Sequence, residues 1–96
     1  MLLSNYDIGT LVTCSPDIGG GRPMIAGTKT PVSRVVALYK QGAGAEEIAR
    51  RMSHLSLAQV YAALAYYHAN QDRVEADLAN EDAEYWRLAA LHPNKD

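Results

Sequence analysis

The stretch that decides the fold reads GGRPMIAGTKTPV and covers residues 20–32. It joins a glycine-rich turn, a short apolar segment at Met24 and Ile25, and a proline that suits the first position of a helix. The Gly-Lys-Ser/Thr triplet that a phosphate-binding P-loop requires does not follow the glycines. The stretch therefore predicts a turn and a strand that lead into a helix near Pro31.

A second apolar segment, residues 11–14, precedes this stretch, and turn residues separate the two. The sequence thus predicts two short strands, at residues 11–14 and 23–25. Pro23 favours a strand edge because it has no N–H for a ladder. A two-stranded ribbon is marginal alone in water, so we expect these strands to lie on the helices or to pair with strands of another chain.

The first predicted helix runs from Pro31 to Gln41, with Thr30 or Ser33 available to cap it. Its large apolar residues recur with helical spacing and predict a buried stripe that leaves Arg34 and Lys40 nearer to solvent. The stripe consists of Val32, Val35, Val36 and Tyr39.

The second predicted helix covers residues 45–52, after a turn at Gly42-Ala43-Gly44. Two glutamates fall in its first turn, and Arg50 and Arg51 fall in its last. This order matches the helix dipole, so the charges have a structural explanation. Ile48, Ala49 and Met52 are expected to face inward.

The third helix has the strongest start signal, because Ser56 and Gln59 form a capping-box pattern while Leu55 and Val60 are spaced for a hydrophobic staple. A short helix, a four-residue connection and a longer apolar helix predict a helix-turn-helix. The predicted buried face is Leu57, Val60, Tyr61, Leu64 and Tyr67 or His68. The predicted exposed positions are Ala58, Gln59, Ala62, Ala63 and Tyr66.

A break at Asn70 or Gln71 ends the third helix, and residues 72–91 resume a helical pattern. We therefore expect a mainly α fold with a ribbon and helix-turn-helix domain at residues 1–70 and a helical extension at 71–96. The extension either orders against a partner or packs back on its own domain. Its apolar positions are Val74, Leu78, Tyr85, Trp86 and Leu88.

Residues that carry catalytic or metal chemistry are sparse. Cys14 is the only cysteine, so an intrachain disulfide is impossible and a reducing cytoplasm is the expected compartment. The histidines are isolated, without the His-Glu-x-x-His pattern, and we expect no enzyme, metal or cofactor. No segment approaches the roughly 20 apolar residues that span a bilayer, so no membrane association is expected.

The net charge of −2 conceals an asymmetry. The chain up to Met52 contains six Lys or Arg and four Asp or Glu, whereas the chain from Ser53 onward contains three Lys or Arg and seven Asp or Glu. The first part of the chain, up to Met52, therefore has a positive net charge and offers candidate contacts to nucleic-acid phosphates. Ser56 could also contact a phosphate and Gln59 an adenine edge, although capping alone explains both. The candidate DNA-binding residues are Arg22, Lys29, Arg34, Arg50, Arg51, Ser56 and Gln59.

The stretch at residues 20–32 resembles the bacterial domain-of-unknown-function family 433, whose pattern is Gly-Gly-Lys/Arg-Pro-x-Ile-x-Gly-Thr-Arg/Lys-x-Pro-Val. The resemblance extends over about residues 12–78 and departs from the usual pattern at Lys29, Gly44 and Ser53-His54. Lys29 keeps the charge of the usual arginine but loses its bidentate hydrogen bonding. Further matching positions are Gly42, Glu46, Glu47, Ile48, Leu55, Leu57, Val60, Ala63, Leu64 and Tyr66 or Tyr67.

The resemblance implies a homeodomain-like or winged-helix-like fold and the role of an antitoxin and autorepressor, since such proteins are often encoded beside a PIN-like ribonuclease toxin. We therefore expect a homodimer that binds this toxin through residues 72–91 and operator DNA through the helix-turn-helix. The alternative is a protein-interaction module without DNA binding, which dimerises by strand pairing. The candidate toxin-binding residues are Arg73, Leu78, Tyr85, Trp86, Arg87 and Leu88.

Overall fold

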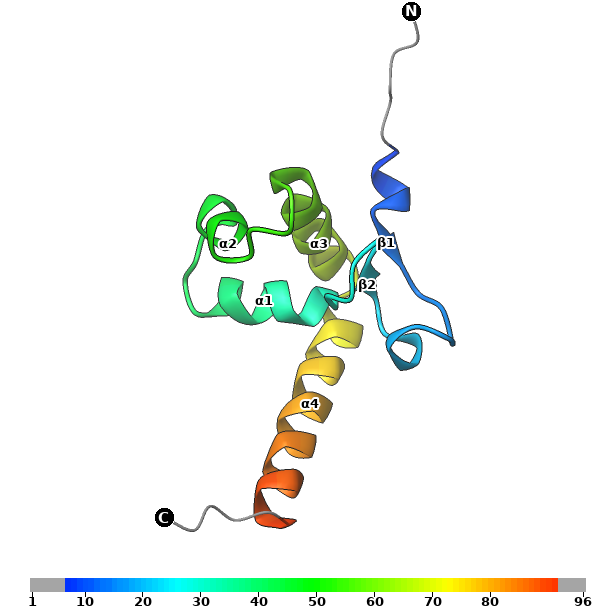
Figure 1. Ribbon diagram of the computed structural model, residues 1–96, viewed down its shortest axis with the longest axis vertical. Coiled ribbons are helices and arrows are strands. Elements are labelled where there is room, and N and C mark those ends of the chain that lie inside the picture. Colours follow the sequence, from blue (N-terminus) through cyan, green and yellow to red (C-terminus); the bar gives the residue numbers. More distant parts are fainter. Residues whose placement is uncertain (1–6, 92–96) are drawn as a thin grey trace, which may run out of the picture.

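The computed structural model describes residues 7–91, and four helices follow a short two-stranded ribbon in this part of the chain. Figure 1 shows helices α1 to α3 gathered beside the ribbon, with α4 leading away from them. The predicted mainly α fold is confirmed. The elements are η1 (Ile8–Thr10), β1 (Val12–Thr13), η2 (Gly19–Gly21), β2 (Met24–Ile25), α1 (Val32–Lys40), α2 (Ala45–Arg51), α3 (Leu57–Ala69) and α4 (Gln71–Leu91).

The ribbon is antiparallel, with Val12 opposite Ile25 and Thr13 opposite Met24. Both strands are shorter than predicted because the chain turns back directly after them. The Ile25 N–H donates to the Thr30 carbonyl at 2.9 Å, which closes the loop into α1. Ile25 is completely buried, so the ribbon lies on the helices. This is one of the two arrangements that the sequence predicted.

The core lies between α1, α2, α3 and the ribbon, and the predicted stripe of α1 supplies three fully buried valines to it. Tyr39, predicted to be buried, is instead 36% exposed, since it lies at the end of α1 beside His68. The expected side-chain cap of α1 is also absent: Pro31 is the N-cap residue, while Thr30 and Ser33 bond elsewhere. The core residues are Ile25, Val32, Val35, Val36, Ile48, Leu55, Val60, Ala63, Leu64, Tyr67 and Val74.

Helix α3 begins as predicted, with a complete capping box between Ser56 and Gln59. The sequence predicted the buried face of α3 only partly correctly. Leu57 and Tyr61 are 39% and 56% exposed, whereas Ala62 and Ala63 are buried. Small side chains allow α3 to approach the neighbouring helices and β1 closely, and a helix that is apolar on every side gives the sequence pattern no means to choose between faces.

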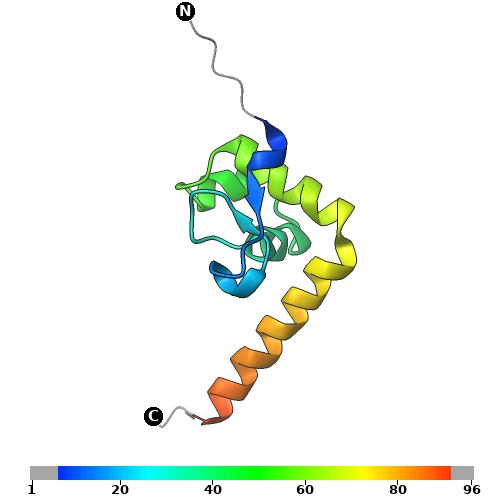
Figure 2. The same cartoon turned by 90° about the vertical axis from the view of Figure 1, so that its right-hand side faces the viewer.

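Helix α4 starts at Gln71, directly after the predicted break, and turns sharply away from α3 (Figure 2). Val74 is completely buried in the core, and Leu78 packs against the same cluster. The predicted division at residues 70 and 71 thus coincides with a helix break, while the core continues across it. The C-terminal part of the helix extends past the body (Figure 1).

Candidate functional surfaces

Three of the seven candidate DNA-binding residues meet in one depression of the surface, which we call the basic concavity. Lys29 comes from the β2–α1 loop, Arg34 from the first turn of α1, and Arg51 from the end of α2. None of the described residues that line this depression carries a carboxylate. They are Lys29, Thr30, Arg34, Leu38, Arg51, Met52, Ser53 and His54.

The β2–α1 loop that carries Lys29 is fixed by its own hydrogen bonds. The Thr28 N–H and hydroxyl both donate to the Ile25 carbonyl, at 3.1 and 2.8 Å, and the Thr28 hydroxyl accepts from the Thr30 N–H at 3.0 Å. Gly27 has φ 77°, a left-handed conformation that favours glycine. The Gly-Thr-Lys-Thr sequence therefore builds a rigid support for Lys29.

Thr30 and His54 form a contact that sequence reasoning missed. Thr30 Oγ1 and His54 Nε2 lie 2.7 Å apart, with the donor set by the histidine tautomer. The contact joins the β2–α1 loop to the α2–α3 turn, which are 24 positions apart. Spacing alone gave no signal for it, because the pair depends on how the helices pack.

The two arginines of α2 share one carboxylate. Arg50 Nη2 lies 2.8 Å from Glu47 Oε1, and Arg51 Nη2 lies 2.8 Å from Glu47 Oε2. The side chains remain 72% and 52% exposed, respectively. Of the two, only Arg51 lines the basic concavity.

The remaining DNA-binding candidates are engaged within the chain. The Ser56 hydroxyl accepts from the Gln59 N–H at 3.1 Å, and Gln59 Oε1 accepts from the Ser56 N–H at 2.7 Å. Both side chains thus serve the helix cap. Arg22 donates to the Gly19 carbonyl at 2.9 Å and pairs with Glu81 of α4.

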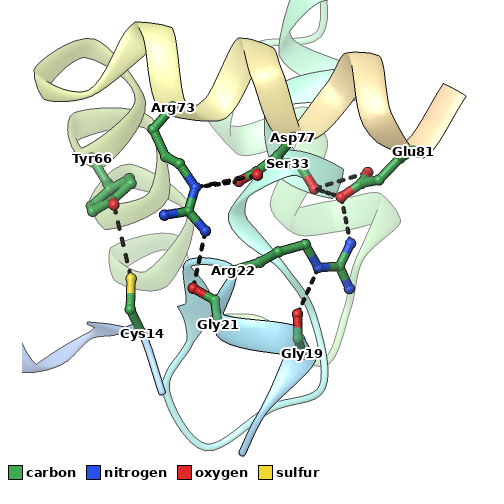
Figure 3. A network of polar contacts seen from close by, with 9 residues as sticks. All are labelled: Cys14, Gly19, Gly21, Arg22, Ser33, Tyr66, Arg73, Asp77 and Glu81. Carbon is green, nitrogen blue, oxygen red and sulfur yellow. Dashed lines mark hydrogen bonds and ion pairs between the residues drawn. The ribbon is translucent and has the colours of Figure 1, made fainter. Parts of the chain in front are cut away.

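A polar network fastens the first half of α4 to the body (Figure 3). Glu81 accepts from Arg22 and, at 2.8 Å, from the hydroxyl of buried Ser33. Nearer the start of α4, Arg73 donates to Asp77 at 3.2 Å and to the Gly21 carbonyl at 3.0 Å. Arg73, a candidate toxin contact, is therefore held against its own ribbon loop.

A second cluster ties α1, α3 and α4 together at Glu75. Lys40 Nζ donates to Glu75 Oε1 at 2.6 Å, and the Tyr67 hydroxyl donates to Oε2 at 2.6 Å. The hydrogen bond from Lys40, followed by that from Tyr67, lowers the pKa of Glu75. The same hydrogen bonds to Glu75 raise the pKa of Lys40 and of Tyr67.

Cys14 and Tyr66 form a weaker link between the ribbon side and α3 (Figure 3). The Cys14 sulfur and the Tyr66 hydroxyl lie 3.9 Å apart. Burial, and then the contact with Cys14, raise the pKa of Tyr66. Cys14 itself is exposed.

The outer segment of α4, which we define as residues 83–91, exposes four large apolar side chains. Tyr85, Trp86, Leu88 and Leu91 are 63%, 62%, 45% and 61% exposed. Tyr85 and Trp86 pack edge to face, with ring centroids 5.1 Å apart. On the same segment Arg87 pairs with Glu84, which raises the pKa of Arg87 and lowers that of Glu84.

Within residues 7–91, no group of three potential metal ligands is clustered. None of the helices in this range combines the length and the apolar character needed to cross a membrane.

Comparison with known proteins identifies the family. The family model described as protein of unknown function (DUF433) matches residues 12–67, more than half of the chain. No curated protein matches. A crystal structure of a DUF433 member protein from Anabaena variabilis ATCC 29413 is similar, with 28% sequence identity and a TM-score of 0.66 over 73% of this chain and 69% of that one. The chain therefore belongs to the DUF433 family.

Proposed function

We propose that the chain is a cytoplasmic antitoxin of a bacterial type II toxin-antitoxin system, which binds a PIN-like ribonuclease toxin through the outer segment of α4. The observation that supports this proposal is the row of exposed apolar side chains at Tyr85, Trp86, Leu88 and Leu91. Aromatic residues that are exposed on a projecting element are typical anchors of protein interfaces.

The charges of α4 refine the proposed contact. Arg73 is bound to Asp77 and to the ribbon loop at Gly21, whereas Arg87 pairs only with Glu84 of the same exposed segment and is 60% exposed. A nuclease centre that holds metal ions is acidic, so a guanidinium is a suitable partner for it. We therefore assign the approach to the toxin centre to Arg87, with Leu78 and Arg73 setting the position of the helix.

The test is co-purification with the PIN-like ribonuclease toxin that the proposal expects to be encoded beside this gene. Truncation after Asp82 removes the outer segment and keeps Val74 and Leu78 in the core, whereas a cut after Asn70 would also remove core residues. We expect the shortened chain to lose the toxin. The matched control is Tyr61→Ala, which removes an exposed aromatic ring from α3. A shortened chain that retains undiminished affinity would refute the proposal.

Binding of operator DNA is the second proposed activity, and the basic concavity supports it. Lys29, Arg34 and Arg51 bring three cations together beside the helix-turn-helix. A protein dimer would double these contacts. We expect Arg50→Ala combined with Arg51→Ala to weaken DNA binding and to reduce the salt slope by about two. Mobility shift at two salt concentrations measures both quantities. An unchanged salt slope would refute the proposed DNA binding.

The alternative is a dimeric protein-interaction module that does not bind DNA. Residues 53–71 contain no Asp, Glu, Lys or Arg, and the exposed face of α3 presents Leu57, Ala58 and Tyr61. This face resembles the charge-depleted centre of a protein interface more than a groove-reading helix. A dimer in solution that binds no DNA at low salt would favour this alternative.

A further inference from the structure

Arg34 occupies a position that helix stability does not explain. It lies in the first turn of α1, where the helix dipole disfavours a cation, and this turn contains no acidic residue. Arg34 is exposed, and among residues 7–91 it forms no ion pair. A bound anion would interact favourably with this guanidinium.

The groups around Arg34 suit such an anion. Lys29 forms no ion pair within residues 7–91 and reaches the same depression from its rigid loop. Arg51 enters from the end of α2, and Ser53 adds a hydroxyl. None of the described residues that line the depression is acidic, so Lys29 and Arg34 give it a positive potential, whereas Glu47 partly offsets the charge of Arg51.

We propose that the basic concavity binds a phosphate group, with Arg34 and Lys29 as its principal contacts. Arg34 can form a bidentate contact with two phosphate oxygens, while Lys29 acts as a compact charge and the hydroxyl of Ser53 adds a further donor. The phosphate belongs either to a nucleic-acid backbone or to a free phosphate ester. In the first case the site deepens the DNA-binding half of the proposed function and grips DNA without reading its bases.

The proposed phosphate site contains only some of the candidate DNA-binding residues, so variants can distinguish the two sets. Arg22 is paired with Glu81, Ser56 and Gln59 cap α3, and Arg50 lies outside the concavity. Binding of phosphate should therefore depend on Arg34 and Lys29 and not on every cation of the basic half of the chain.

The first experiment is a titration of the ¹⁵N-labelled protein with inorganic phosphate and pyrophosphate, followed by NMR. We expect saturable shifts at Lys29, Thr30, Arg34 and Ser53. Arg34→Gln or Lys29→Gln should raise the dissociation constant about tenfold. The matched control is Lys40→Gln, which removes the same charge from the other end of α1, outside the concavity, and should leave the constant within about twofold.

Equal effects of Arg34→Gln and Lys40→Gln would overturn the proposal, as would shifts spread over every cationic surface. Two further probes distinguish the sources of phosphate: AMP, and a DNA duplex without terminal phosphates. If AMP binds in an Arg34-dependent manner and the duplex does not bind, the phosphate site stands and the DNA half of the proposed function fails. If the duplex binds Arg34→Gln and Lys40→Gln equally well, DNA binding stands and this site is refuted.

Discussion

The Ser33 hydroxyl donates to the Glu81 carboxylate at 2.8 Å across 48 positions of sequence. Ser33 is only 3% exposed, and Arg22 approaches the same carboxylate from the ribbon loop. The start of α1 and the middle of α4 are therefore joined by a charge-assisted bond at the place where α4 leaves the body. This contact fastens α4 to the body shortly before the outer segment begins.

Glu81→Ala should destabilise the protein by about 1–2 kcal/mol, because it leaves the buried Ser33 hydroxyl without its acceptor and removes the ion-pair partner of Arg22. Urea unfolding followed by circular dichroism measures the change. The control is Asp82→Ala, which removes the same charge from an exposed neighbour and should cost less than about 0.5 kcal/mol. Equal losses in the two variants would show that the contact contributes nothing beyond charge.

Stability should fall in acid as Glu75 becomes protonated. Its pKa in the folded protein lies below its ordinary value of 4.5, so its contribution is fully present above pH 4.5 and is lost as pH falls through the lower, folded value. Lys40 behaves in the opposite sense: its contribution is present below pH 10.5 and is lost as pH rises through its raised pKa.

The measurement for this pH dependence is the melting temperature of the wild type and of Glu75→Gln between acid and neutral pH. We expect the wild type to lose more stability on acidification than the variant, so that the two curves converge at low pH. Asp82→Asn, at an exposed position without a described partner, should follow the wild type. Parallel curves for the wild type and Glu75→Gln would contradict the assignment.

Ser56→Ala should cost about 1 kcal/mol, because the capping box loses its acceptor for the Gln59 N–H. Ser56→Asp retains an N-cap acceptor and should preserve stability. The same pair tests the DNA hypothesis. If Ser56 contacts a phosphate, Ser56→Asp should weaken DNA binding despite normal stability. If Ser56 only caps the helix, the same substitution should weaken DNA binding less. Thermal unfolding and mobility shift provide the two readouts.

Tyr61→Lys separates the two proposals for the exposed face of α3. If this face lies against DNA, the added cation should strengthen binding and steepen the salt dependence by about one. If it is the interface of a dimer, the buried charge should dissociate the dimer. Light scattering and mobility shift on the same samples record both effects. Arg87→Lys, on the outer segment of α4, leaves the charge unchanged and should alter neither.

The sequence by itself determined the elements that depend on neighbouring residues. The capping box at Ser56 and Gln59, the break at Asn70 and the proline-led start of α1 are all local, so they could be predicted with their positions nearly right. The family could be recognised from the same stretch, because its glycines and prolines impose backbone conformations that few other residues adopt.

Only the tertiary structure decided which side chains meet. Helix α3 is apolar on every side, so its packing, and not its periodicity, buried Ala63 and exposed Tyr61. The pairs Arg22 with Glu81 and Thr30 with His54 join residues that are 59 and 24 positions apart. Such contacts depend on the angles between helices, and single-residue spacing contains no information about these angles.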